Sequence, residues 1–253
     1  MPAPVNRLKA NLLGGQLQKG LWMGLASATV AEMASNAGFD WCLIDAEHGP
    51  NDLITIQSQL QAMNGAPASP VVRVPVAEDW MLKQVLDLGA QNLLIPMIDT
   101  GEQAAQAVAA CRYPPDGIRG LGSALARASG YNAIPDYPTT ANDQICVMVQ
   151  AESRAAIDKI DAIAGTDGVD VVFIGPADLS ADMGYLGQLD APEVEEVIAH
   201  AIARIRVAGK VAGIVLFNPD DFPRYIEMGV GFLGMGSDVT SLAASLRDLA
   251  RSV

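Results

Sequence analysis

The sequence has little positive charge and little cysteine, and both shortages narrow what the protein can do. Its 16 lysines and arginines face 29 aspartates and glutamates, which gives a net charge of −13. This charge repels phosphate backbones and anionic lipid surfaces, so neither nucleic acid nor a membrane is expected as a partner. The three cysteines show no CxxC spacing, and Cys42 and Cys146 fall in apolar segments, where a thiol acts as a small hydrophobic group. A reducing cytoplasm is therefore the expected setting.

Long apolar runs are also missing. The first 20 residues contain no apolar segment long enough for a signal peptide, and no later stretch approaches the length of a membrane span. In other respects the composition is ordinary, because half of the 253 residues are hydrophobic and 18% are charged. A chain of this length can form one α/β barrel or two smaller domains.

Apolar segments and segments with helical spacing alternate eight times along the chain. Expected strands cover residues 21–25, 41–45, 70–74, 92–96, 144–149, 169–174, 210–216 and 232–235. Expected helices cover residues 29–37, 52–63, 80–88, 102–111, 154–163, 192–208, 220–228 and 239–252. Eight strand-helix pairs are typical of a TIM barrel, and a doubly wound open sheet is the second choice. We therefore predict one α/β barrel domain over residues 1–253.

Two segments stand outside this alternation. Residues 1–19 are polar and are predicted to form a loose N-terminal extension. Residues 112–143 form a long connection before the fifth strand, and such a connection is usually functional, part of an interface, or folded into short helices. We expect it to cover an edge of the active site or to contact another subunit.

Two carboxylates follow neighbouring strands. Glu152 comes just after the expected fifth strand and Asp178 just after the sixth. The carboxyl ends of successive parallel strands lie side by side, so both side chains can reach one point at the mouth of the barrel. Two such ligands with open positions between them suit a hard divalent cation such as Mg²⁺ or Mn²⁺. The alternative is that Glu152 is a first-turn helix acid and that Asp178 is a loop acid or helix cap.

Only two histidines are present, and their positions differ. His200 lies on the polar side of an amphipathic helix and is expected to be solvated. His48 follows the second strand at the catalytic end of the barrel, three residues after Asp45. An aspartate that accepts a hydrogen bond from one imidazole nitrogen leaves the other nitrogen free as a base. We predict this role for His48 with Asp45, and a structural histidine bonded to its loop is the alternative.

Arg73 ends an apolar strand, where an unpaired guanidinium is unfavourable. A two-pronged grip on a substrate carboxylate would satisfy it, and so would a neighbouring acid such as Asp45 or Glu47. Both possibilities stay open from the sequence. After the sixth strand, the backbone N–H groups of Ala177 and Asp178 could face an anion such as a carboxylate.

The sequence offers little support for three other kinds of site. None of the five lysines falls at the carboxyl end of an expected strand, so a Schiff-base mechanism has no nucleophile. Ser123 and Ser129 have no histidine partner in an esterase-type motif. The segment GMGSDV at residues 234–239 is similar to a phosphate-binding turn, but Asp238 would place a negative charge there. We favour a plain turn with a helix cap.

Five motifs, taken in their order, resemble the HpcH/HpaI family of metal-dependent pyruvate aldolases. They are LIDAEHGPND (43–52), VVRVP (71–75), YPPDGIRGLGSALARASGY (113–131), VQAES (149–153) and FIGPADLSADMGY (173–185). The resemblance extends from about residue 21 to the C-terminus. It implies a TIM barrel of the phosphoenolpyruvate/pyruvate superfamily, usually a hexamer in which paired subunits exchange the eighth helix. It also implies a place in the catabolism of aromatic compounds or sugar acids.

The same resemblance assigns roles to residues of this chain. The metal, which would be Mg²⁺, Mn²⁺ or Co²⁺, would be held by Glu152 and Asp178, with Gln150 lining the site beside them. The base dyad would be His48 with Asp45, and Arg73 would contact pyruvate. For the aldehyde pocket we name Trp22, Leu216 and the loop from Ser123 to Ala126.

Residues and resemblance together predict a class II aldolase. It would reversibly cleave a 4-hydroxy-2-oxo acid to pyruvate and an aldehyde through an enolate that the divalent metal stabilises. One alternative is a metal-dependent lyase acting on a CoA thioester or a phosphorylated substrate, which would need a phosphate-binding patch. Another is a barrel that binds a metal and an organic acid without catalysis.

Overall fold

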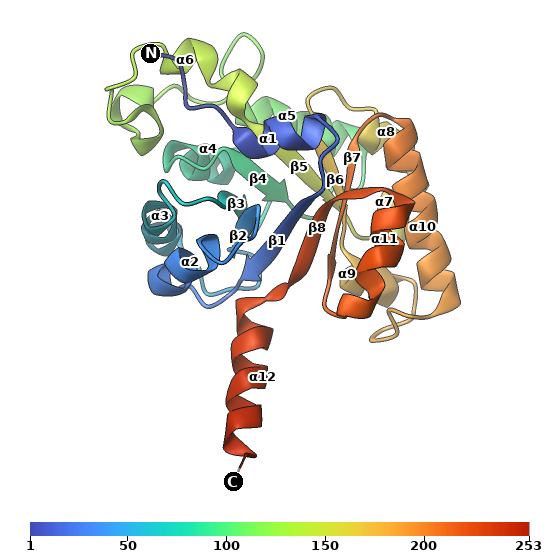
Figure 1. The fold of residues 1–253 in the computed structure, drawn as a ribbon. Coiled ribbons are helices and arrows are strands. Elements are labelled where there is room, and N and C mark those ends of the chain that lie inside the picture. Colours follow the sequence, from blue (N-terminus) through green and yellow to red (C-terminus); the bar gives the residue numbers. More distant parts are fainter. Residues whose placement is uncertain (253) are drawn as a thin grey trace.

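The structure is a computed structural model and describes residues 1–252. Eight parallel strands form a closed barrel in chain order, and β8 pairs with β1 to complete it (Figure 1). The strands are β1 (Gln18–Met23), β2 (Trp41–Asp45), β3 (Ser69–Arg73), β4 (Asn92–Ile95), β5 (Cys146–Ala151), β6 (Val171–Ile174), β7 (Val211–Leu216) and β8 (Val230–Ser237). All eight predicted strands are present with ends displaced by a few residues, and the predicted TIM barrel is confirmed.

All but the last of the main helices surround the barrel and connect its strands, and the last one follows β8. They are α2 (Ala28–Ser35), α3 (Leu53–Ala62), α4 (Asp79–Asp87), α5 (Gly101–Cys111), α7 (Arg154–Asp158), α8 (Ile160–Ala164), α9 (Pro176–Asp182), α10 (Pro192–Val207), α11 (Phe222–Met228) and α12 (Asp238–Ala250). The helix expected over residues 154–163 is divided at Lys159 into α7 and α8, and α9 was not predicted. Within residues 1–252, none of the helices has the length and apolar character needed to cross a bilayer.

The barrel interior is filled by aromatic side chains. Trp41 stacks on Phe232 with ring centroids 4.0 Å apart, and Gly20 on β1 leaves the space that the Trp41 ring occupies. Above them, the rings of Trp22 and Phe173 lie with centroids 5.4 Å apart. Residues that face the other way along each strand form a second, larger core between the barrel and the helices. The interior aromatic layer supports the cavity at the carboxyl ends of the strands.

Helix α1 (Arg7–Leu13) lies at the amino-terminal end of the barrel and corrects one prediction. Residues 1–19 were expected to be a loose extension, but Leu8 and Leu12 are buried among the residues of the barrel interior, and β1 already begins at Gln18. The Asn6 side chain caps α1 by accepting the Lys9 N–H at 3.0 Å. The boundary at residue 19 was wrong because two leucines in a seven-residue helix make too short a pattern to recognise.

The long connection over residues 112–143 folds into short helices at the amino-terminal end of the barrel (Figure 1). These are η1 (Ser123–Leu125), η2 (Arg127–Ser129), α6 (Tyr137–Thr140) and η3 (Asn142–Gln144). The connection packs beside the N-terminal segment, where Thr140 Oγ1 accepts the Ala3 N–H at 2.8 Å. This is the end opposite the cavity, so the expectation that the connection borders the site of its own chain was wrong. Its other predicted role, a subunit contact, stays a prediction.

Helix α12 extends away from the barrel after β8 and ends near the C-terminus (Figure 1). Four apolar side chains repeat at helical spacing along it and are exposed: Val239, Leu242, Leu246 and Leu249. In a single chain this apolar stripe has no core to cover, although an amphipathic helix normally buries such a stripe.

Candidate active site

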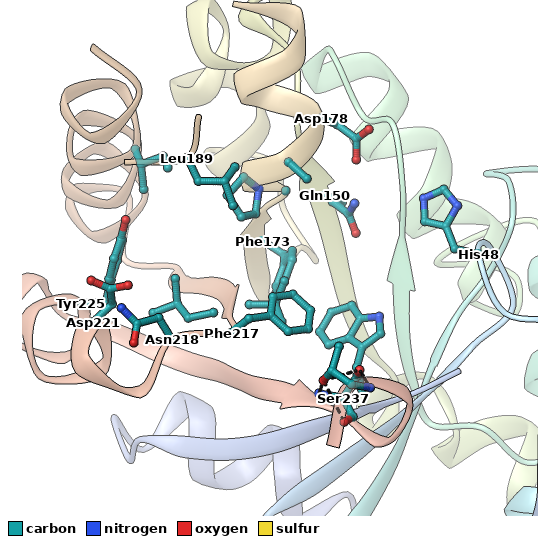
Figure 2. Close-up of a pocket in the computed structure, with 18 of the residues that line it drawn as sticks. His48, Gln150, Phe173, Asp178, Leu189, Phe217, Asn218, Asp221, Tyr225 and Ser237 are labelled. Carbon is teal, nitrogen blue, oxygen red and sulfur yellow. Dashed lines mark hydrogen bonds between the residues drawn. The ribbon is translucent and has the colours of Figure 1, made fainter. Parts of the chain in front are cut away.

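A cavity of about 750 Å³ opens at the carboxyl ends of the strands, the end where TIM-barrel enzymes build their active sites. Its lining includes Trp22 on β1 and Phe173 on β6. Figure 2 shows His48, Gln150 and Asp178 gathered on one side of this cavity. Residues predicted from three separate parts of the sequence therefore share one space.

Glu152 is held in place by two hydrogen bonds just after β5. Its Oε1 accepts the Met97 N–H at 2.8 Å, and its Oε2 accepts from the Gln150 side-chain amide. Met97 has a φ of 56°, a left-handed conformation that is uncommon outside glycine and often marks functional sites. Burial raises the pKa of the Glu152 carboxyl, and the nearby charge of Asp178 raises it further, against the two hydrogen bonds.

Asp178 lies in the first turn of α9, directly after β6. This short helix begins at Pro176, which has no N–H to lose and is suited to a helix start. The N–H groups of Ala177 and Asp178 belong to this first turn, where the N–H groups have no partner within the helix. This helix was not predicted, because seven residues beginning with proline carry little periodicity.

Gly175 is a further site residue, which was not predicted from the sequence. A Cβ placed on it would lie 2.6 Å from Glu152 Oε2 and 3.2 Å from Gln150 Nε2. Only a residue without a side chain allows the turn between β6 and α9 to approach Glu152 this closely. The glycine in the segment FIGPAD was the available signal, but a glycine at a strand end more often marks an ordinary turn.

The two carboxylates fit a divalent cation only if other ligands complete its shell. Within the described residues, no group of three or more histidine, cysteine or acidic side chains converges on one point. Hard cations such as Mg²⁺ and Mn²⁺ bind through one or two carboxylates and take water or substrate oxygens for the rest. Glu152 and Asp178 supply two carboxylates, and Asp178 borders a cavity in which water or substrate oxygens could complete the shell. The residues present therefore fit the predicted metal.

Arg73 is buried at the end of β3 and pairs with two acids, Asp45 at the end of β2 and Glu47 just after it. It donates to Asp45 through Nε at 2.9 Å and Nη2 at 2.6 Å, and its Nη1 lies 2.8 Å from Glu47 Oε2. Its guanidinium carbon lies 5.3 Å from the centre of the Trp22 ring. Burial raises the pKa of Glu47, while the positive charge of Arg73 opposes this rise. The two neighbouring acids that the sequence offered as partners of Arg73 do pair with it. Contact between Arg73 and the substrate stays a prediction.

His48 and Asp45 are not arranged as the predicted dyad. Asp45 Oδ1 accepts the backbone N–H of His48 at 3.3 Å and that of Glu47 at 3.1 Å, while Arg73 binds both carboxylate oxygens. Among residues 1–252, the imidazole forms no hydrogen bond to Asp45. The ring is exposed and borders the cavity near Gln150 and Asp178 (Figure 2). The base role of His48 is compatible with this position, but the expected orienting bond was wrong.

The other predicted site residues divide between the cavity and the far end of the barrel. Gln150, Trp22 and Leu216 line the cavity. Leu216 also packs against the core between the barrel and the helices, whereas its neighbour Val215 packs against the barrel interior. Residues 123–126 lie at the amino-terminal end, away from the cavity of their own chain. His200 is exposed on α10, as expected.

The segment GMGSDV forms the predicted helix cap. Ser237 caps α12 in a capping box with Thr240, and the Asp238 carboxylate accepts the N–H groups of Gly24 and Leu25 at 2.8 and 3.2 Å. The first-turn N–H groups of Val239 and Thr240, which a phosphate would need, are accepted by the side chains of Asp238 and Ser237 at 2.7 and 3.1 Å. This arrangement argues against a phosphate site at the end of β8.

Comparisons with known proteins agree with this geometry. Residues 18–245 match the profile of the family described as HpcH/HpaI aldolase/citrate lyase. The chain is 56% identical over 250 residues to the hydroxypyruvate/pyruvate aldolase of Agrobacterium fabrum, covering 99% of this chain and 94% of that protein. It is 52% identical over 245 residues to the 4-hydroxy-2-oxo-heptane-1,7-dioate aldolase of Salmonella paratyphi C, covering 97% and 93% of the two chains.

A solved structure is also similar over nearly the whole chain. It is the crystal structure of an HpcH/HpaI aldolase/citrate lyase family protein from Burkholderia cenocepacia. The two chains share 40% sequence identity with a TM-score of 0.95, and the match covers 98% of each.

Proposed function

The chain belongs to the HpcH/HpaI aldolase/citrate lyase family, and we propose that it is a class II aldolase that reversibly cleaves a 4-hydroxy-2-oxo acid to pyruvate and an aldehyde. The observation that supports this most is that Asp178 and the buried Arg73 line one cavity, while Glu152 is hydrogen-bonded to Gln150, which lines the same cavity. This set offers oxygen ligands for a hard cation and a guanidinium that can bind a carboxylate. A 2-oxo acid uses both, because it carries a keto oxygen and a carboxylate.

In this proposal Glu152 and Asp178 hold Mg²⁺, Mn²⁺ or Co²⁺. When bound, the cation supplies positive charge that stabilises the negative charge developing on the pyruvate part as the carbon–carbon bond breaks. The chain contributes the position of Glu152, because the N–H of Met97 and the amide of Gln150 fix both carboxylate oxygens. Gly175 contributes the space in which the turn bearing Asp178 comes close.

The pyruvate carboxylate meets Arg73 and the first turn of α9. Asp45 and Glu47 hold the guanidinium through all three of its nitrogen atoms, so the substrate binds a group whose geometry is already set. The N–H groups of Ala177 and Asp178 add donors near the positive end of the short helix. A guanidinium fixed in advance loses less conformational freedom when substrate binds.

His48 is the group proposed to move the proton. In cleavage it accepts the proton of the C4 hydroxyl, and in the aldol direction it returns that proton. Its backbone N–H is tied to Asp45, which anchors the turn that carries the ring while leaving the ring itself free at the cavity edge. The aldehyde part then faces Trp22, Val215 and Leu216 on the apolar side of the cavity.

Two other functions receive less support. A lyase acting on a CoA thioester or a phosphorylated substrate would need a phosphate-binding patch, and the side chains of Ser237 and Asp238 occupy first-turn N–H donors of α12, the best candidates for one. A barrel that binds a metal and an organic acid without catalysis would explain Glu152 and Asp178. It gives no role to an exposed imidazole at the cavity edge.

We also propose that the protein works as an oligomer, a hexamer in which paired subunits exchange α12. The support is the exposed apolar stripe of α12 and its direction away from its own barrel (Figure 1). Sedimentation velocity would test this assembly. A monomer at micromolar concentration would contradict it.

The catalytic proposal is tested by proton NMR of pyruvate in D₂O. We expect the methyl signal to disappear in the presence of the protein with Mg²⁺ or Mn²⁺ and to persist after EDTA is added. This measurement follows proton loss at the methyl carbon and needs no knowledge of the aldehyde. Absence of exchange with the metal present, together with no pyruvate release from any 4-hydroxy-2-oxo acid, would reject the proposal.

A further inference from the structure

The cavity continues from the reaction site into a second region, which we call the outer lobe. It lies between the start of α10, the segment before it, and the residues after β7. The outer lobe is lined by Leu189, Asp190, Glu195, Phe217, Asp221 and Arg224. Figure 2 shows Leu189, Phe217 and Asp221 across the cavity from His48 and Asp178. A substrate held at the reaction site would therefore direct its distal end toward this lobe.

The outer lobe contains one cation, and a carboxylate already holds it. Arg224 Nη2 lies 2.7 Å from Glu195 Oε1 and 3.8 Å from Asp221 Oδ1, and the guanidinium lies over the Tyr225 ring. The hydrogen bond from Arg224 lowers the pKa of Glu195, which keeps this carboxylate ionised at neutral pH. The lobe thus has three carboxylates and one guanidinium among the described residues, and negative charge remains unbalanced.

The cation at the other end of the cavity is also engaged. Arg73 is held by Asp45 and Glu47 beside the proposed pyruvate site. A substrate with one carboxylate can place it at that end. A substrate with a second, distal carboxylate would bring that charge into the acidic outer lobe, where like charges repel.

We propose that the outer lobe receives the aldehyde end of the substrate and selects an uncharged end over one that carries a second carboxylate. Glu195 acts as the selecting residue because it engages Arg224, the guanidinium that lines the lobe among residues 1–252. Leu189 and Phe217 offer apolar contacts to the same uncharged end. This inference rests on the proposed function, since it names the class of aldehyde released at the same site.

The test compares two substrates of equal chain length. One is 4-hydroxy-2-oxoheptanedioate, which has a distal carboxylate, and the other is 4-hydroxy-2-oxoheptanoate, which has a distal methyl group. Pyruvate release is followed with lactate dehydrogenase at low ionic strength with Mg²⁺ present. We expect kcat/KM to be about tenfold higher for the uncharged substrate, and we expect added salt to narrow this ratio because salt screens the repulsion.

Two variants of the lobe sharpen the test. Glu195→Gln removes the carboxylate that holds Arg224, so kcat/KM for the dioate should rise about tenfold while the uncharged substrate changes little. Asp221→Asn should shift the ratio in the same direction and serves as the second variant if the first folds poorly. Asp167→Asn is the matched control, because Asp167 is exposed in the segment before β6, at the opposite end of the barrel. It should leave the ratio unchanged.

The outcomes separate this inference from the proposed function. Release of pyruvate from neither substrate, with no methyl exchange, would overturn the proposed function and the inference with it. Release from both substrates with equal or higher kcat/KM for the dioate would overturn the inference alone, and would mean that Arg224 leaves Glu195 to bind the second carboxylate. A ratio that neither lobe variant moves would also overturn it.

Discussion

Arg73 and Asp45 face each other across the register of β3 and β2 and share two hydrogen bonds, from Nε to Oδ1 at 2.9 Å and from Nη2 to Oδ2 at 2.6 Å. Both residues are buried, so the pair holds the guanidinium in one orientation at the mouth of the barrel. Removing one partner of such a buried pair strongly destabilises the folded protein, because the other charge is left buried and unpaired. The roles of Arg73 and Asp45 can therefore be separated by substitution.

Arg73→Lys should lower kcat/KM by about 100-fold, because an ammonium cannot keep the two-pronged geometry toward Asp45 and a substrate carboxylate together. Steady-state kinetics of pyruvate release would measure this loss. Arg204→Lys is the matched control, since Arg204 makes the same two-pronged pair with Asp161 on the outer surface, at 2.7 Å for both bonds. Kinetics close to wild type in Arg73→Lys would leave Arg73 with a structural role alone.

Asp45→Asn should act through Arg73 and not through the imidazole of His48. We expect a loss of about 3 kcal/mol in the free energy of unfolding, measured by urea titration, because a buried charge loses its partner. KM should rise while the shape of the pH–rate profile stays that of the wild type. A displaced profile with unchanged stability would restore the dyad of His48 and Asp45.

His48→Ala and Asp178→Ala should fail in different ways. Loss of the proposed base in His48→Ala should lower kcat by about 10²- to 10⁴-fold with Mn²⁺ binding retained. Loss of a ligand in Asp178→Ala should weaken Mn²⁺ binding by about 100-fold or more. Electron paramagnetic resonance of free Mn²⁺ measures binding without reference to activity. Equal loss of Mn²⁺ in both variants would contradict the assignment of roles.

Gly175→Ala should disturb the metal site although the added group is only a methyl. The new Cβ would lie 2.6 Å from Glu152 Oε2, so the carboxylate or the turn before α9 must shift. We expect Mn²⁺ affinity to fall about tenfold or more. Gly122→Ala is the control, because the nearest atom to its added Cβ is 3.9 Å away, in ordinary contact. Unchanged Mn²⁺ affinity in Gly175→Ala would show that the turn adapts freely.

Glu47 should make stability depend on pH in a direction opposite to that of Glu195. Burial raises the pKa of Glu47, so the folded protein keeps a proton that the unfolded chain has lost as the pH rises above the ordinary value of 4.5. Its contribution to stability therefore falls as pH rises through this interval. For Glu195 the sign is reversed, because the hydrogen bond from Arg224 lowers its pKa. Its contribution to folding stability is fully present above the ordinary pKa of 4.5 and is lost as the pH falls through the lowered pKa of the folded state.

Thermal unfolding of the two glutamine variants checks these signs. The Tm of Glu47→Gln, relative to wild type, should be higher at pH 8 than at pH 4.5. The lower pH equals the ordinary pKa of glutamate, and the higher pH lies well above it. The relative Tm of Glu195→Gln should decrease or stay level over the same range, because its pair with Arg224 is partly exposed and screened. The same slope in both variants would contradict the stated causes.

Local pattern predicted most of the fold and the main candidates of the site. Strand β2 was placed at residues 41–45 because its apolar run is bounded by polar turns, and Glu152 and Asp178 followed from the rule that TIM-barrel sites lie at the carboxyl ends of strands. Helices α1 and α9 were missed because each has seven residues, fewer than two full turns of amphipathic pattern. Short elements are stabilised mainly by tertiary contacts, which a local pattern does not contain.

The sequence by itself determined the alternation of strands and helices and the end of the barrel at which His48, Glu152 and Asp178 lie. Tertiary structure alone decided which partner each charged group takes. Asp45 binds Arg73 and not the imidazole because the register of β2 against β3 sets their distance. The Glu195–Arg224 pair likewise joins α10 to α11. Such pairing depends on distances of a few ångströms between residues far apart in the chain, and local propensity does not encode those distances.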